Sequence, residues 1–156
     1  MLSLDPRNVM LQVQADNWEE VIRIGVRRLQ ENGYVPESYA DEVIAREREY
    51  PTGLPTEDVF TALPHAFSEN VIKTGFCALR LTKPVIFRNM ADSDQELPVE
   101  LVFLLVNASG ADAHLQALSD LMGCFSRQNL LLDLKNAADA AAFVRIMENW
   151  EEYPEA

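Results

Sequence analysis

The stretch from Pro98 to Val106 constrains the fold of this chain more than any other. Seven of its nine residues are aliphatic or aromatic, with only Pro98 and Glu100 interrupting them. Such a nearly continuous apolar run is typical of a central strand that is covered on both faces. Shorter strand-like runs lie at 59–63, 75–81 and 85–87.

Helices are predicted on both sides of this strand-rich middle. Asp16 or Asn17 can cap the first helix, and Asn32-Gly33 ends it. Its apolar face has helical spacing and is formed by Trp18, Val21, Ile22, Gly25, Val26 and Leu29. The second helix is expected from about Glu37 to Glu49, where Pro51 stops it, with Tyr39, Val43 and Ile44 facing inward.

Two more helices are predicted toward the end of the chain. Asp112 can cap the first, on which one stripe is formed by His114, Leu118, Leu121 and Phe125. After a short apolar piece at 130–132, the last helix extends from about Ala137 to Trp150. Its candidate packing residues are Ala141, Val144, Ile146 or Met147, and Trp150. The sequence therefore predicts an α/β fold, with a mixed central β-sheet of about five strands and helices packed on its faces.

Composition narrows the class of protein. A chain of 156 residues with 48% hydrophobic residues can build a real core, and without repeats or a linker we expect one domain over residues 1–156. The net charge of −12 disfavours binding to nucleic acid or to anionic membrane surfaces. It also means that any site for a phosphate group must supply positive charge locally.

The cysteines and the first residues of the chain indicate the cellular compartment. Cys77 and Cys124 stand far apart without a CxxC motif, which indicates buried free thiols in a reducing compartment. The beginning of the chain has no basic start or long apolar core of a signal peptide, and no apolar run is long enough to cross a membrane. We therefore expect a cytoplasmic protein without direct membrane insertion.

His65 is the leading candidate for chemistry. The run from Val59 to Leu63 suits a strand, and Pro64 cannot donate to a β-ladder, so His65 is expected just beyond the carboxyl end of a strand. Ligands of open α/β sheets bind at that edge, and a histidine there can act as nucleophile, base or metal ligand. From pattern alone, the alternative is a hydrogen-bonded structural histidine.

The residues around His65 resemble a known family. The segment Arg46-Glu47-Arg48-Glu49-Tyr50-Pro51-Thr52-Gly53-Leu54 precedes Ala62-Leu63-Pro64-His65-Ala66 by a short spacer. This motif and its spacing are similar to the signature region of the mannitol/fructose-type enzyme IIA domains of the sugar phosphotransferase system (PTS), and most similar to the galactitol-type branch. The resemblance extends through Lys73-Thr74-Gly75 to His114. One departure is Thr61, where the family usually has a larger aliphatic residue.

The resemblance implies a phosphoryl relay with a phosphohistidine intermediate, and hence a phosphotransferase. On this resemblance, His65 would take a phosphoryl group from the histidine-containing phosphocarrier protein HPr and pass it to a cysteine of the enzyme IIB subunit. An unperturbed histidine has a pKa of about 6.5 and is mostly neutral at pH 7, so the reaction requires no cofactor and no metal. Arg46 matches the arginine of the family, and its planar guanidinium suits phosphate oxygens. The alternative for Arg46 is a salt bridge with Glu42 or Glu49 near the helix end.

Three weaker candidates complete the site. His114 matches the second histidine of the mannitol-type domains and is a supporting residue, with core packing as its alternative. Thr52 and Asn70 are candidates for polar contacts with the phosphoryl group. Alternatively, Thr52 closes the turn with Gly53, and Asn70 caps a helix after His65.

Three functional interpretations remain open. The first is an enzyme IIA of an uptake system for a sugar or sugar alcohol that depends on phosphoenolpyruvate, with galactitol as the leading type. The second is a regulatory, nitrogen-type enzyme IIA whose phosphorylation switches its contacts with other proteins. The third is a metal-dependent hydrolase that uses His65 and His114; it is poorly supported, because catalytic zinc typically has three protein ligands.

Overall fold

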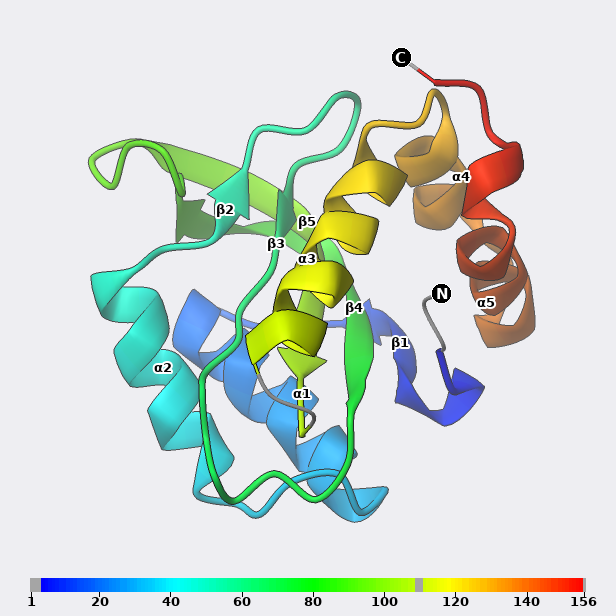
Figure 1. Ribbon diagram of the computed structural model, residues 1–156. Helices are drawn as coiled ribbons and strands as arrows, with labels where there is room; N and C mark the ends of the chain where they lie inside the picture. Colours follow the sequence, from blue (N-terminus) through cyan, green and yellow to red (C-terminus); the bar gives the residue numbers. More distant parts are fainter. Residues whose placement is uncertain (1–3, 109–110, 156) are drawn as a thin grey trace.

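A five-stranded sheet forms the centre of the molecule (Figure 1). The computed structural model describes residues 4–108 and 111–155, with the backbone alone for 111–114. The strands are β1 (Val9–Val13), β2 (Gly53–Leu54), β3 (Thr61–Ala62), β4 (Gly75–Arg88) and β5 (Glu96–Val106). Their order across the sheet is β1-β4-β5-β3-β2. β5 lies in the middle and is buried from Leu101 to Val106, as its apolar run predicts.

The sheet is mixed. β1 runs parallel to β4 and β3 runs parallel to β5, whereas the β4–β5 and β2–β3 pairs are antiparallel. The predicted strands at 75–81 and 85–87 are one strand, β4, whose pairing with β5 shifts register between Arg80 and Val85. The shift is an irregularity of the kind that bends a strand without ending it.

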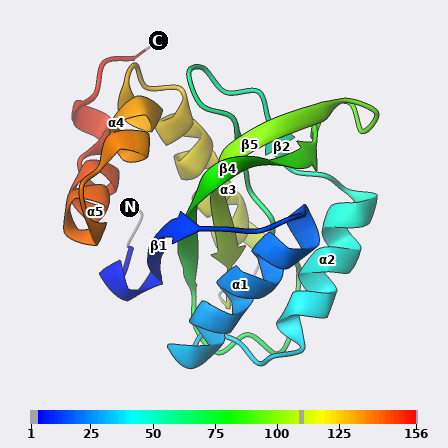
Figure 2. The same cartoon turned by 180° about the vertical axis from the view of Figure 1, so that it is seen from behind.

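Helices cover both faces of the sheet (Figures 1 and 2). One layer holds α1 (Trp18–Glu31) and α2 (Tyr39–Glu49); the other holds α3 (Ala111–Phe125), α4 (Leu130–Asn136) and α5 (Ala140–Glu148). Short 3₁₀ turns lie at Pro6–Asn8 and Trp150–Glu152. Two apolar clusters, one on each face, form the core, and the predicted α/β sandwich is confirmed.

Local signals account for the first helix. The side chain of Asn17 accepts a hydrogen bond from the Glu20 N–H at 2.9 Å, and the Glu20 carboxylate accepts one from the Asp16 N–H at 3.3 Å. Asn17 is therefore the residue that caps this helix, one of the two that the sequence offered, and Glu20 ties back the residue before it. At the other end, Gly33 has a φ of 82°, a left-handed conformation that glycine adopts without strain.

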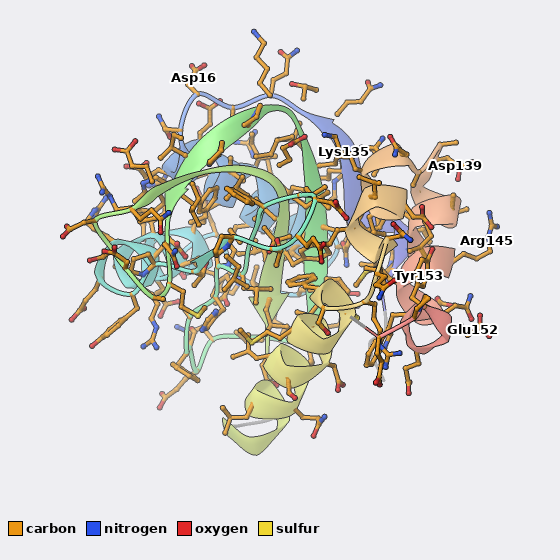
Figure 3. The ribbon with its side chains drawn as sticks, turned by 90° about the horizontal axis from the view of Figure 1, so that it is seen from above. Asp16, Lys135, Asp139, Arg145, Glu152 and Tyr153 are labelled. Carbon is orange, nitrogen blue, oxygen red and sulfur yellow. The ribbon has the colours of Figure 1, made fainter. Side chains whose placement is uncertain are left out.

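The C-terminal part differs from the prediction. The apolar piece at 130–132 begins a helix, α4, and the last helix starts at Ala140, capped by Asp139, rather than at Ala137. Ala141 is exposed, whereas Phe143 is fully buried. In Figure 3, Lys135, Asp139, Arg145 and Glu152 lie in this part, with Arg145 and Glu152 projecting outward.

Candidate functional site

His65 follows β3 in the sequence and still pairs with the neighbouring strand β5. The regular strand ends at Ala62, but the Leu105 N–H donates to the Pro64 carbonyl at 3.0 Å, and His65 forms a single parallel bridge with Leu105. The prediction that Pro64 ends the pairing was therefore wrong, because the carbonyl of proline still accepts. His65 is 8% exposed, so it is much less open than a position beyond a strand end suggests.

The hydrogen bond at Nδ1 defines the tautomer of His65. Nδ1 lies 2.7 Å from the carbonyl oxygen of Leu63, which can only accept, so Nδ1 carries the proton and Nε2 the lone pair. Burial lowers the pKa of His65; the bond to Leu63 opposes this effect, and the charge of Arg46 lowers the pKa further. The neutral, nucleophilic form is therefore favoured near neutral pH.

One face of α2 holds the segment that carries His65. The Tyr39 hydroxyl donates to the Leu105 carbonyl at 2.9 Å and accepts from the Ala66 N–H at 3.2 Å. Burial raises the pKa of Tyr39 to about 12, so this hydroxyl keeps its proton. One turn further along, Glu42 accepts from the Ser68 hydroxyl at 2.9 Å. Figure 1 shows this segment descending beside α2.

Arg46 lies on the same face of α2, where the spacing 39, 42, 46 aligns side chains. Its guanidinium carbon is 4.6 Å from the centroid of the Tyr50 ring and 5.0 Å from that of Phe67. The Phe67 ring also meets His65 edge-on, with centroids 6.3 Å apart. Phe67 thus links the guanidinium and the imidazole.

One donor of Arg46 has no acceptor. Its Nε atom is buried and has no hydrogen-bond partner, and within the described residues Arg46 makes no ion pair. The alternative of a salt bridge with Glu42 or Glu49 was therefore wrong. A buried donor without an acceptor is costly, and an incoming anion relieves that cost.

The weaker candidates have different surroundings. Thr52 is buried, and its hydroxyl donates to the Glu47 carboxylate at 2.8 Å. Asn70 is exposed in a turn, where its N–H donates to the Ser68 hydroxyl at 3.2 Å, so it does not cap a helix. His114 lies in the first turn of α3, but its side chain is outside the described part of the structure.

Sequence reasoning missed three residues of this region. Glu47 is buried, and the spacing 39, 43, 47 on α2 already placed it on the inward face with Tyr39 and Val43. Tyr50 follows Arg46 by one helical turn, which is the spacing of neighbouring side chains. For Phe67, which is 60% exposed, the sequence offers no comparable signal.

The described residues contain no group of three or more His, Cys, Asp or Glu side chains that could hold a metal ion. Among the same residues, no helix has both the length and the apolar character needed to cross a membrane.

Sequence comparison identifies relatives in one transport system. Residues 2–150 match the family model described as "Phosphoenolpyruvate-dependent sugar phosphotransferase system, EIIA 2". The chain is 27% identical over 150 residues to the mannitol-specific EIICBA component of Vibrio cholerae, covering 94% of this chain but 22% of that protein. It is 34% identical over 91 residues to the galactitol-specific EIIA component of Escherichia coli O6:H1, covering 58% of this chain and 59% of that protein.

Solved structures share the fold. The complex of the mannitol enzyme IIA with phosphorylated enzyme IIB from Escherichia coli matches with a TM-score of 0.80 at 22% identity, covering 96% of this chain and 99% of the other. The nitrogen regulatory protein IIA-Ntr from Neisseria meningitidis matches with a TM-score of 0.77 at 24% identity, covering 92% and 95%. Because the family model matches nearly the whole length of the chain, the chain belongs to the EIIA type 2 family of the phosphoenolpyruvate-dependent sugar phosphotransferase system.

Proposed function

We propose that this protein is a phosphoryl-carrier subunit, an enzyme IIA, in which Nε2 of His65 accepts a phosphoryl group from HPr and passes it to a cysteine of enzyme IIB. One observation carries the proposal: a histidine with a defined tautomer shares the Phe67 ring with an arginine whose buried Nε lacks an acceptor. Residues 1–156 are proposed to act as one such domain.

The phosphoryl transfer needs no dedicated base, because the attacking nitrogen carries no proton. The Nε2 lone pair attacks phosphorus, the P–N bond of the donor phosphohistidine breaks, and the donor ring leaves neutral when its other nitrogen holds a proton. The Nδ1 proton of His65 stays on the ring and donates to the Leu63 carbonyl, so the phosphorylated ring is cationic. Attack by the IIB thiolate then forms the P–S bond, breaks the Nε2–P bond and returns His65 to the neutral form.

Arg46 supplies the charge that this transfer needs. The protein has a net charge of −12, which repels a phosphoryl group at long range. The guanidinium rests against the rings of Tyr50 and Phe67, and within the part of the chain that the structure describes it pairs with no carboxylate. Such preorganised positive charge stabilises the charge that is spread over the transferring group.

The transported compound is proposed to be a sugar alcohol of the galactitol type, supported by the 34% identity to a galactitol-specific EIIA component. A regulatory role is the second candidate, supported by the structural similarity to a protein titled nitrogen regulatory IIA-Ntr. We propose a cytoplasmic location, because Cys77 and Cys124 are buried free thiols that suit a reducing compartment.

The test is to incubate the protein with phosphoenolpyruvate, enzyme I and HPr, and then to add candidate enzyme IIB proteins. We expect one acid-labile, base-stable phosphate per chain, absent in His65→Ala, and transfer to a galactitol-type IIB. Full labelling of His65→Ala would refute the proposed nucleophile. Labelling without transfer to any IIB would favour the regulatory candidate.

A further inference from the structure

The carboxylate of Glu47 is buried beside the site and joined to it by hydrogen bonds. Glu47 lies in the last turn of α2 and is 4% exposed. Its Oε2 accepts from the Thr52 N–H at 2.7 Å, and its Oε1 accepts from the Thr52 hydroxyl at 2.8 Å. Both donors belong to one residue, so the carboxylate holds Thr52 in a single orientation.

The chain of hydrogen bonds continues from Thr52 to the histidine. The Thr52 hydroxyl gives its only proton to Glu47, so its oxygen is oriented to accept, and the Leu63 N–H donates to it at 3.1 Å. On the other side of its Cα atom, the Leu63 carbonyl accepts from Nδ1 of His65 at 2.7 Å. The main chain of Leu63 is thereby held next to the group that defines the His65 tautomer.

We propose that Glu47 is a positioning residue for His65: through Thr52 it holds the Leu63 main chain so that the Leu63 carbonyl accepts the hydrogen bond from Nδ1–H and Nε2 presents its lone pair. The inference deepens the proposed phosphoryl transfer and rests on it. Glu47 does not touch the phosphoryl group and acts only through Thr52 and Leu63.

A carboxylate at position 47 can accept both hydrogen bonds from Thr52. A glutamine has one acceptor oxygen, so its NH₂ group would face one of the two Thr52 donors. Burial raises the pKa of Glu47 to about 7, and the two hydrogen bonds from Thr52 oppose this rise because they favour the ionised carboxylate. A small cavity of about 100 Å³ beside Glu47 is lined by Arg48 and Arg88, which pair with Glu19 at 4.0 Å and Glu96 at 3.7 Å. Thr52 therefore supplies the polar contacts that hold this carboxylate.

The test compares Glu47→Gln and Thr52→Val with Thr52→Ser, which keeps the hydroxyl. The matched control is Thr61→Val, because Thr61 is fully buried in β3 and its hydroxyl lies 3.2 Å from that of Thr56, outside the chain to His65. Each variant is measured for initial phosphoryl transfer from HPr, for unfolding by urea, and for the His65 tautomer by nitrogen NMR, with the His65 signals assigned in His114→Ala.

We expect Glu47→Gln and Thr52→Val to slow transfer by at least about tenfold, as for other partners that orient a functional histidine, and to convert the Nδ1–H form of His65 into a mixture of tautomers. Thr52→Ser is expected to keep the wild-type transfer rate and the Nδ1–H tautomer. Thr61→Val is expected to be less stable than the wild type but to keep the same rate and tautomer. An unchanged tautomer in Glu47→Gln and Thr52→Val, or the same change in Thr61→Val, would overturn the inference. If the wild type takes no phosphate, the proposed function fails, whereas the tautomer measurement still tests Glu47.

Discussion

The guanidinium of Arg46 lies against the ring of Phe67, with 5.0 Å between the guanidinium carbon and the ring centroid. Phe67 is 60% exposed, which is unusual for so large an apolar side chain. Its ring also contacts His65, so one exposed aromatic residue borders both groups of the proposed transfer. This relationship leads to the first prediction.

Removal of the Phe67 ring should loosen Arg46. A cation–π contact at an exposed site contributes about 0.5–1 kcal/mol, so Phe67→Ala is expected to slow phosphoryl transfer about two- to fivefold. Phe67→Tyr keeps the ring and serves as the control, with a rate close to that of the wild type. Equal rates for Phe67→Ala and wild type would show that Tyr50 alone orients the guanidinium.

Removal of Arg46 should affect transfer far more than stability. Arg46→Ala takes away the charge that faces the phosphoryl group, and we expect at least about a tenfold slower transfer, or ~1.4 kcal/mol of barrier. Because no ion pair of Arg46 is lost, urea unfolding should change little. Arg46→Lys keeps the charge without the planar fork and should recover only part of the rate. A wild-type rate in Arg46→Ala would exclude Arg46 from the site.

The titration of His65 reports on the same pair of residues. Burial and the charge of Arg46 both lower the pKa of His65 from its ordinary value of 6.5. Proton NMR should therefore show His65 titrating below that value, and Arg46→Gln should raise its pKa toward it. The exposed Arg23, which pairs with Asp41 on α2, provides the control variant Arg23→Gln, without effect on this titration. An unchanged His65 pKa in Arg46→Gln would contradict the proximity of the Arg46 charge to His65.

The stability of the protein should depend on pH through Glu47. Its pKa is raised from the ordinary 4.5 to about 7 in the folded state, so the folded protein binds the proton more tightly than the unfolded chain. This contribution to the free energy of unfolding is fully present below about pH 4.5 and is lost as the pH rises through about 7, a change of about 3 kcal/mol. Urea unfolding of wild type and Glu47→Gln across this window should show the wild type losing stability relative to the variant. Parallel curves would mean that Glu47 titrates normally.

Local signals in the sequence determined much of the architecture. The Asn17 cap before Trp18, the proline after α2 and the apolar run of β5 act within a few residues, because helix hydrogen bonds and caps join near neighbours. His65 and Arg46 were also proposed as site residues from the sequence, through a motif that is confined to one short region. β1 was not predicted, since it lies at the edge of the sheet with partly covered side chains and is defined by its parallel pairing with β4.

Tertiary structure alone decided how the site is assembled. Instead of the salt bridge that the sequence left as the alternative, Arg46 makes two aromatic contacts. One is to Phe67, which only the packing of the segment after β3 against α2 brings within reach. The tautomer of His65 likewise depends on hydrogen bonds that run from Glu47 through Thr52 to Leu63. Helices and caps follow from neighbours in the chain, whereas these contacts join residues from separate elements and exist only after the sheet and its helices have packed.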